Sequence, residues 1–233
     1  MNQKHTIRMA ALTCTLLATT AVQAEEASFI GPSIALGISS VKGENKYQSS
    51  SVISKEMANY SKYVNKLDIN DNFAQVKQHS PVSIDLSYGV PLSAKLVGTV
   101  GLNHDFGNYG LGSTTIAKGK GIPDTTLSSS LKKHWSVYLS PGLRIGDRWL
   151  AYAKGSYHQA QGNYSLAKMD KTTESESYTH HGLGYGVGAA FAATRNIEAR
   201  MEVEQVKFNT QSNVYGSVTP KMTRANLLVG YRF

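Results

Sequence analysis

Apolar and polar residues alternate with a period of two along most of the chain. Between residues 82 and 90, for example, Val82, Ile84 and Leu86 are separated by small or polar residues. Successive side chains of a β-strand point to opposite faces, so this alternation predicts strands with one apolar face. Eight segments share it: 30–38, 82–90, 96–106, 135–145, 149–158, 182–191, 197–204 and 224–233. A tilted strand needs about ten residues to cross a bilayer, and these segments have that length.

The connections between these segments have two lengths. Short ones span 91–93, 146–148 and 194–196, whereas long ones span 43–79, 107–132, 160–178 and 209–220. An even number of strands with alternating short and long connections is typical of a transmembrane β-barrel. We therefore predict an all-β fold, an eight-stranded antiparallel up-and-down transmembrane β-barrel. The short turns and both chain ends would face the periplasm, and the long loops would be extracellular.

A soluble β-sandwich or lipocalin-like barrel is the alternative fold, and it would turn the apolar set inward. The opposite set argues against it, because Gly182, Gly184, Gly186 and Gly188 are an odd choice for a face exposed to water. Small residues mixed with charges suit the narrow interior of an eight-stranded barrel instead. Pro32 and Pro141 count slightly against a barrel, since each removes a ladder hydrogen bond.

Residues 1–24 have the pattern of a secretory signal peptide. Lys4 and Arg8 form a positive start, an apolar stretch follows, and Val22 and Ala24 supply the small residues that precede a cleavage site. The mature domain would be 25–233, located in the outer membrane. The sole cysteine, Cys14, would leave with the signal, so neither disulfides nor a thiolate site are expected.

The composition excludes several other classes of protein. Charged residues make up 17% of the 233 residues, which is too few for a disordered polyelectrolyte. No apolar run reaches the ~18 residues of a transmembrane helix. The formal charge of +8 is spread along the chain, so nucleic acid is not an expected partner.

Two motifs resemble those of small bacterial outer-membrane barrels. The chain ends in Tyr231, Arg232 and Phe233 after alternating apolar residues, which is similar to the C-terminal signal that the barrel assembly machinery recognises. The block 134–152, HWSVYLSPGLRIGDRWLAY, resembles the fourth strand, turn and fifth strand of the Ail/PagC/OmpX-type barrels. The resemblance to these and to opacity-type surface proteins implies a role in adhesion or in resistance to host defence.

Several charged residues are predicted to point into the barrel, where an isolated charge would cost several kcal/mol and each must therefore be paired. This predicted lumenal network consists of Asp85, Arg144, Lys154, Arg200, Glu202, Glu204 and Arg224, and Glu198 is expected to face the lumen with them. Eight strands leave an interior that side chains fill. A structural plug is therefore favoured over a narrow gated pore.

Three histidines and one His-x-Ser pair are the residues of the lumen with the most reactive side chains. His134, His158 and His180 are predicted to lie near one another in the lumen, where they could bind zinc or sense pH, but no ligand spacing supports a metal site. His134 and Ser136 resemble the His-x-Ser pair of outer-membrane lipid A deacylases, yet Val137 stands where that family has Asn. We predict no enzyme, no cofactor and no metal.

The long loops carry the predicted ligand contacts, which are lysines and tyrosines: Lys46, Tyr47, Lys55, Tyr60, Lys62, Tyr63, Lys66, Lys118 and Lys120. Lysines at the outer rim would attract lipopolysaccharide phosphates and other outer-membrane lipids. Exposed tyrosines beside lysines also suit binding to a host protein or a sulfated glycan. A surface protein acting in adhesion or host-defence resistance is predicted, with a minor small-solute channel or a purely structural barrel as alternatives.

Overall fold

The computed structural model describes residues 29–49, 74–119, 122–168, 171–213 and 216–233. The predicted signal peptide therefore lies outside the described residues. None of the described segments forms a helix long and apolar enough to cross a membrane.

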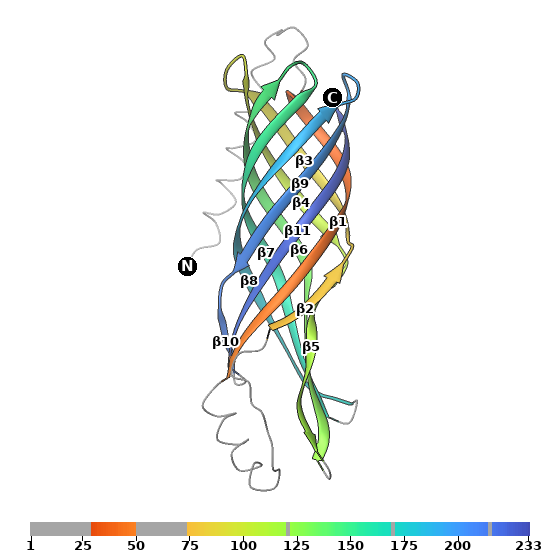
Figure 1. Ribbon diagram of the computed structural model, residues 1–233, viewed down its shortest axis with the longest axis vertical. Helices are drawn as coiled ribbons and strands as arrows, with labels where there is room; N and C mark the ends of the chain where they lie inside the picture. Colours follow the sequence, from red (N-terminus) through yellow and green to blue (C-terminus); the bar gives the residue numbers. More distant parts are fainter. Residues whose placement is uncertain (1–28, 50–73, 120–121, 169–170, 214–215) are drawn as a thin grey trace, which may run out of the picture.

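Eight antiparallel strands close into a barrel (Figure 1). They are β1 (Gly31–Ser49), β3 (Val82–Pro91), β4 (Leu96–Phe106), β6 (Ile122–Ile145), β7 (Trp149–Lys168), β8 (Lys171–Ala192), β9 (Ile197–Phe208) and β11 (Gly216–Arg232). Each pairs with its neighbour, and β1 pairs with β11 along Ser33↔Arg232 to Ser49↔Gly216, which closes the sheet. The amide of Phe233 donates to the carbonyl of Pro32 over 3.0 Å and completes the seam.

Three shorter strands extend the barrel at one end. β2 (Ala74–His79) pairs with the outer part of β1, β5 (Tyr109–Gly119) pairs with β6, and β10 (Gln211–Asn213) pairs with β11. We call this end the hairpin end, because the β5–β6 and β7–β8 hairpins project from it. The opposite turn end carries the short connections 92–95, 146–148 and 193–196 (Figure 1).

The eight predicted strands are all present, which confirms the predicted fold, but several are longer than predicted. β6 begins at Ile122 rather than at 135, β7 continues to Lys168, and β8 begins at Lys171. The predicted loops 107–132, 160–178 and 209–220 are therefore mostly paired strand in their described parts. Backbone ladder bonds need no apolar face, and these outer parts are rich in Ser and Thr. Alternation of apolar residues marks only the part of each strand that carries the apolar belt.

The outward face of the barrel is an apolar belt, and the inward face is small or polar. Leu36, Leu183 and Met201 are 63%, 70% and 67% exposed, although no water-soluble fold would leave so many large apolar side chains uncovered. Their strand neighbours Ala35, Gly182 and Glu202 are buried inside. This inversion is the one expected of a barrel surrounded by lipid.

Glycines on the inward face make room for large lumenal side chains. A Cβ atom on Gly188 would lie 2.5 Å from the Tyr152 ring, and one on Gly184 would lie 2.3 Å from the Ser156 hydroxyl. Gly184 and Gly188 of β8 therefore leave space for side chains of β7, whereas a Cβ atom on Gly182 or Gly186 would meet Phe208 or Glu204 of β9.

Candidate functional site: the sealed lumen and the hairpin end

The charges of β9 line the lumen because they occur at every second position. Glu198, Arg200, Glu202 and Glu204 are between 1% and 6% exposed, whereas Met201 and Val203 between them face outward. Removal of these charges from water is costly unless each is paired. The contacts of the lumen show that they are, in two clusters.

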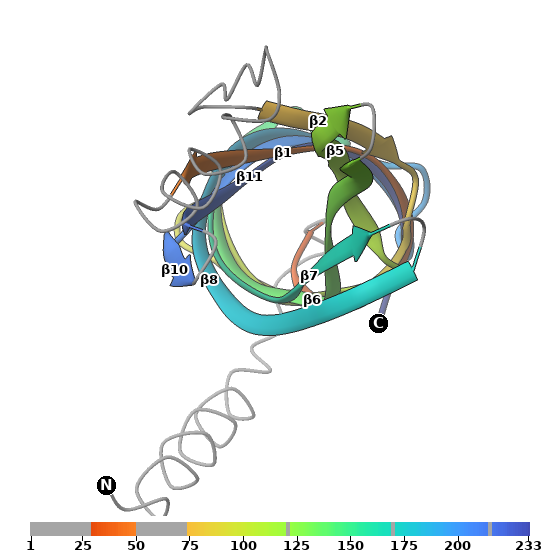
Figure 2. The ribbon, with the colours of Figure 1, turned by 90° about the horizontal axis from the view of Figure 1, so that it is seen from below.

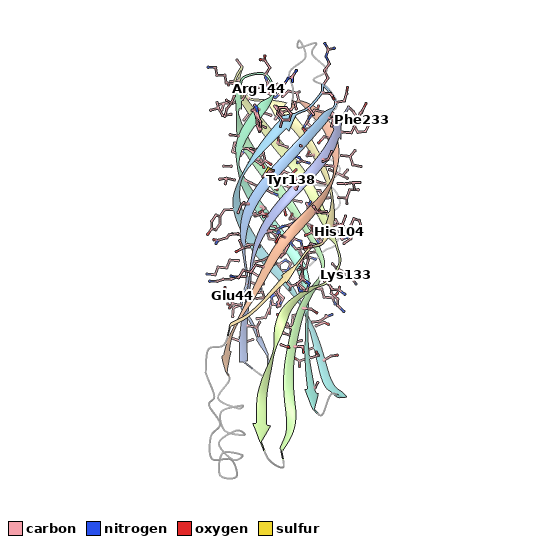
Figure 3. The ribbon with its side chains drawn as sticks, turned by 45° about the vertical axis from the view of Figure 1, so that its right-hand side comes forward. Glu44, His104, Lys133, Tyr138, Arg144 and Phe233 are labelled. Atoms are coloured by element: carbon pink, nitrogen blue, oxygen red, sulfur yellow. The ribbon has the colours of Figure 1, made fainter. Side chains whose placement is uncertain are left out.

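The turn-end cluster consists of Asp85, Tyr138, Glu198, Arg200 and Arg232. Arg200 Nη2 lies 2.7 Å from Asp85 Oδ1, and its Nε lies 3.4 Å from Glu198 Oε1. Tyr138 donates its hydroxyl proton to Asp85 over 3.0 Å, and Figure 3 shows this tyrosine inside the barrel. Arg232 Nη2 lies 2.6 Å from Glu198 Oε2, so two arginines face two carboxylates.

The hairpin-end cluster begins with a second set of ion pairs. Lys154 Nζ lies 2.7 Å from Glu202 Oε2 and 3.7 Å from Glu204 Oε2. Tyr152 donates its hydroxyl proton to Glu202 over 2.9 Å. Arg224 Nη2 lies 3.1 Å from Asp105 Oδ1. These residues come from four strands, β4, β7, β9 and β11, and connect opposite walls of the barrel.

Two histidines link the carboxylates of this cluster. His134 Nδ1 contacts Asp105 Oδ2, and His134 Nε2 lies 2.9 Å from His158 Nδ1. The planes of the two rings are nearly parallel, 12° apart, and their centroids lie 5.0 Å apart, so the rings meet edge to edge through these nitrogens. His158 Nε2 lies 3.2 Å from Glu204 Oε1 and 2.8 Å from the hydroxyl of Ser156. Asp105, His134, His158 and Glu204 therefore form one buried hydrogen-bonded chain.

An apolar cap covers this chain on the hairpin side. The cap consists of Val41, Tyr109, Leu111, Leu131, Ala160, Val206, Phe208 and Met222, all at most 2% exposed. The Tyr109 ring stands edge-on to His134 with centroids 5.8 Å apart. Figure 2, seen from the hairpin end, shows β5, which carries Tyr109 and Leu111, in front of the barrel opening. The mouth of the lumen is therefore closed by apolar packing, and the polar clusters fill the space behind it.

Six of the seven residues predicted for the lumenal network lie in these two clusters: Asp85, Lys154, Arg200, Glu202, Glu204 and Arg224. Arg144 is placed apart from them, half-buried at the turn end beside the β6–β7 turn (Figure 3). The prediction omitted Asp105 and Arg232. Both have the inward parity of their strands, so parity alone could have found them.

The predicted histidine group is divided by the structure. His180 stands apart from the pair, with Nε2 2.7 Å from the Tyr164 hydroxyl, and the Phe208 ring lies 6.4 Å from all three imidazoles. His180 lies on the hairpin side of the apolar belt of β8, and burial lowers the pKa of its imidazole. Within the described residues, no three His, Cys, Asp or Glu side chains are placed to hold a metal ion. His134 bonds to Asp105 and His158, and Ser136 Oγ has no hydrogen-bond partner in the described part of the chain.

Most of the predicted loop contacts lie outside the described residues. Residues Lys55, Tyr60, Lys62, Tyr63, Lys66 and Lys120 lie outside the described residues. Lys46 and Tyr47 belong to β1 and Lys118 belongs to β5, and their side chains also lie outside the description.

A cationic groove lies on the outer wall at the hairpin end, which the sequence analysis did not single out. It has a volume of about 290 Å³, and its lining includes Lys42, Lys207 and Lys221 with a single acid, Glu44. The β-ladder places Lys221 between Glu44 on β1 and Lys207 on β9. Two further residues of the lining contact each other, since Tyr185 donates its hydroxyl proton to Gln205 over 2.6 Å. Figure 3 shows Glu44 at the hairpin end, far from Arg144 and Phe233.

The closed barrel, its outward apolar belt and its paired lumenal charges define an integral β-barrel of a bacterial outer membrane. The chain belongs to the family described as Outer membrane protein beta-barrel domain, which matches residues 10–233. No curated protein matches its sequence.

Solved structures with similar barrels are distant in sequence. Ail, the attachment invasion locus protein of Yersinia pestis, is 16% identical, with 88% of this chain and 99% of that one covered and a TM-score of 0.45. Neisserial surface protein A is 13% identical, with 85% and 99% covered and a TM-score of 0.38. The outer membrane protease OmpT of Escherichia coli is 10% identical, with 92% and 100% covered and a TM-score of 0.48.

Proposed function

We propose that this protein is a non-catalytic surface protein whose hairpin end binds an extracellular ligand, in adhesion or in resistance to host defence. The sealed lumen is the observation that supports this proposal. Ion pairs fill the interior, and the apolar cap closes its mouth. A barrel closed in this way offers the exterior its hairpin end rather than a passage, and function is commonly carried by such connecting segments on a rigid scaffold.

The ligand class is proposed from the lysines and tyrosines of the segments at that end. Residues 43–79 contain five lysines, interleaved with tyrosines, against the four acids Glu44, Glu56, Asp68 and Asp71. Residues 107–132 contain three more lysines against one acid, Asp124. Such a surface suits a sulfated glycan or an acidic host protein. Ail has been crystallised with the heparin analogue sucrose octasulfate. Its sulfate groups would pair with the lysines of this chain, so sucrose octasulfate is a suitable probe for the proposed site.

The test is adhesion of bacteria that display the barrel to a heparin-coated surface, with sucrose octasulfate as competitor. We expect replacement of 50–73 by a short Gly-Ser linker to lower binding at least tenfold, and the competitor to do the same. The matched control shortens the β7–β8 hairpin by removing 165–174, which carries fewer lysines. Unchanged binding after removal of 50–73 would instead favour a structural barrel, and steady conductance in planar bilayers would favour a channel.

We further propose that the cationic groove binds lipopolysaccharide phosphates. Lys42, Lys207 and Lys221 lie beside one acid, Glu44, at the hairpin-end edge of the apolar belt. Lipid phosphates at that depth would meet three ammonium groups and the hydroxyl and amide groups of Thr223 and Gln205. Charge-assisted hydrogen bonds to phosphate are among the stronger polar contacts. This contact would anchor the barrel to the outer leaflet.

A further inference from the structure

The buried chain Asp105–His134–His158–Glu204 contains more hydrogen-bond contacts than two neutral imidazoles can supply with protons. Three contacts join the four side chains. A neutral imidazole carries one N–H, and an ionised carboxylate carries none. Two protons are thus available for three contacts, so one contact would place two lone pairs against each other. We propose that the His134–His158 pair binds one additional proton at neutral pH and acts as a single shared imidazolium.

The hydroxyl of Ser156 does not remove the deficit. Its oxygen lies 2.8 Å from His158 Nε2 and also contacts Glu204 Oε1. The single hydroxyl proton can be donated to one of these atoms and not to both. When it goes to Glu204, a bare Nε2 faces two oxygens. When it goes to His158, the two oxygens face each other. A proton on Nε2 resolves both cases, because it donates toward Glu204 while Ser156 also donates to Glu204.

The net charge of the hairpin-end cluster independently indicates one additional proton. Asp105 on β4, Tyr109 on β5 and Glu204 on β9 contact the pair directly. Arg224 on β11 contacts Asp105, and Lys154 on β7 contacts Glu202 and Glu204, which completes the charged groups of the cluster. Three carboxylates meet two permanent cations, which leaves one negative charge in a space sealed from water. The turn-end cluster is already balanced, with Asp85 and Glu198 against Arg200 and Arg232. One imidazolium makes the hairpin-end cluster neutral, and an uncompensated buried charge is strongly unfavourable.

This proton makes the base of the hairpin end sensitive to pH. His134 and His158 are both 0% exposed, and the Tyr109 and Phe208 rings stand edge-on against them. The proton can leave only when the apolar cap opens. Its loss leaves one unbalanced negative charge among strands β4, β6, β7 and β9. Alkaline conditions therefore loosen the wall from which the β5–β6 and β7–β8 hairpins project.

The direct test counts the ring protons of the pair. The full-length mature protein, labelled with ¹⁵N in histidine and reconstituted in phospholipid nanodiscs, is measured by NMR at pH 7. Signals of the pair are assigned by substitution of His79, His104, His180 and His181 by Gln, which removes the other four. We expect three of the four ring nitrogens of His134 and His158 to carry a proton. Two protonated nitrogens would overturn the proposal.

Glu204→Gln is the matching variant, because it satisfies both counts without the additional proton. Its amide can donate to the bare Nε2 of a neutral His158, and it removes the one unbalanced charge. We expect two ring protons in this variant. Glu198→Gln is the control, since Glu198 contacts Arg200 and Arg232 and not the pair. It should keep three.

The pH dependence of unfolding supplies a second readout. An unfolded histidine loses its proton at about pH 6.5, whereas the folded pair retains its own to higher pH. The stabilisation is therefore fully present below about pH 6.5 and declines as pH rises. Between about pH 7 and pH 9, the unfolding equilibrium constant of the native chain should rise tenfold per pH unit relative to Glu204→Gln. Parallel pH profiles of the two proteins would contradict the shared proton, and this result does not depend on whether the hairpin end binds a ligand.

Discussion

Tyr138 occupies the space that a side chain on Gly101 would need. The two residues are paired across β4 and β6, and a Cβ atom on Gly101 would lie 2.4 Å from the Tyr138 ring and hydroxyl. The same hydroxyl donates to Asp85 on β3. Because Gly101 on β4 has no side chain, Tyr138 on β6 can extend across it and donate to Asp85 on β3.

Gly101→Val should disturb this arrangement. Forcing additional methyl groups into a filled interior costs about 1–3 kcal/mol, and here it would also displace the Tyr138 hydroxyl from Asp85. We expect lower stability in urea titrations of protein folded into lipid vesicles. Gly155→Ala is the control, because that glycine faces outward and a Cβ atom there would meet nothing within 4 Å. Equal stability of both variants would show that the lumen is not filled as described.

Loss of either Arg200 or Asp85 alone should strongly reduce the stability of the barrel, because the two form a buried ion pair. Removal of one member of a buried pair typically costs about 3–5 kcal/mol, because the other charge stays behind. Arg200→Met and Asp85→Asn should each be destabilising, and the double variant should be more stable than the sum of the two predicts. The measurement is a double-mutant cycle in urea. Strict additivity would mean that the two residues do not interact.

The sealed lumen should not conduct ions. In planar bilayers, we expect the native protein to show no steady conductance, because ion pairs and the apolar cap fill its interior. Tyr109→Ala combined with Leu111→Ala opens the cap and should allow brief openings. Steady conductance of the native protein, altered by Glu202→Gln or Arg224→Gln, would support the channel alternative instead.

The cationic groove should bind lipid phosphate through its lysines. We expect Lys42, Lys207 and Lys221, all changed to Gln, to reduce severalfold the lipopolysaccharide that copurifies with the barrel. The barrel itself should still fold, because these side chains face outward. The matched control changes Lys95, Arg148 and Arg195 to Gln at the turn end, which removes the same charge. Equal loss in both variants would mean that net charge matters and the groove does not.

The sequence by itself determined the barrel and its two faces. Side chains of a strand alternate, so residues such as Leu36 and Leu183 on one parity and Arg200 and Glu202 on the other are enough to predict an apolar belt and a charged lumen. The spacing of the strands likewise predicted which connections are short. The sequence could not predict how far β6, β7 and β8 extend at the hairpin end. Strand pairing beyond the apolar belt uses backbone groups and leaves no apolar pattern in the sequence.

Only the tertiary structure decided which lumenal residues meet. Asp105, His134, His158 and Glu204 lie on four different strands, and the ladder registers of the closed barrel bring them to the same level. The packing of Tyr109 and Leu111 of β5 into the apolar cap could not be predicted from the sequence either, because alternation does not show which residues a side chain packs against. Alternation is a local property of one strand. Closure and register are properties of the whole sheet, and they determine which charges become partners.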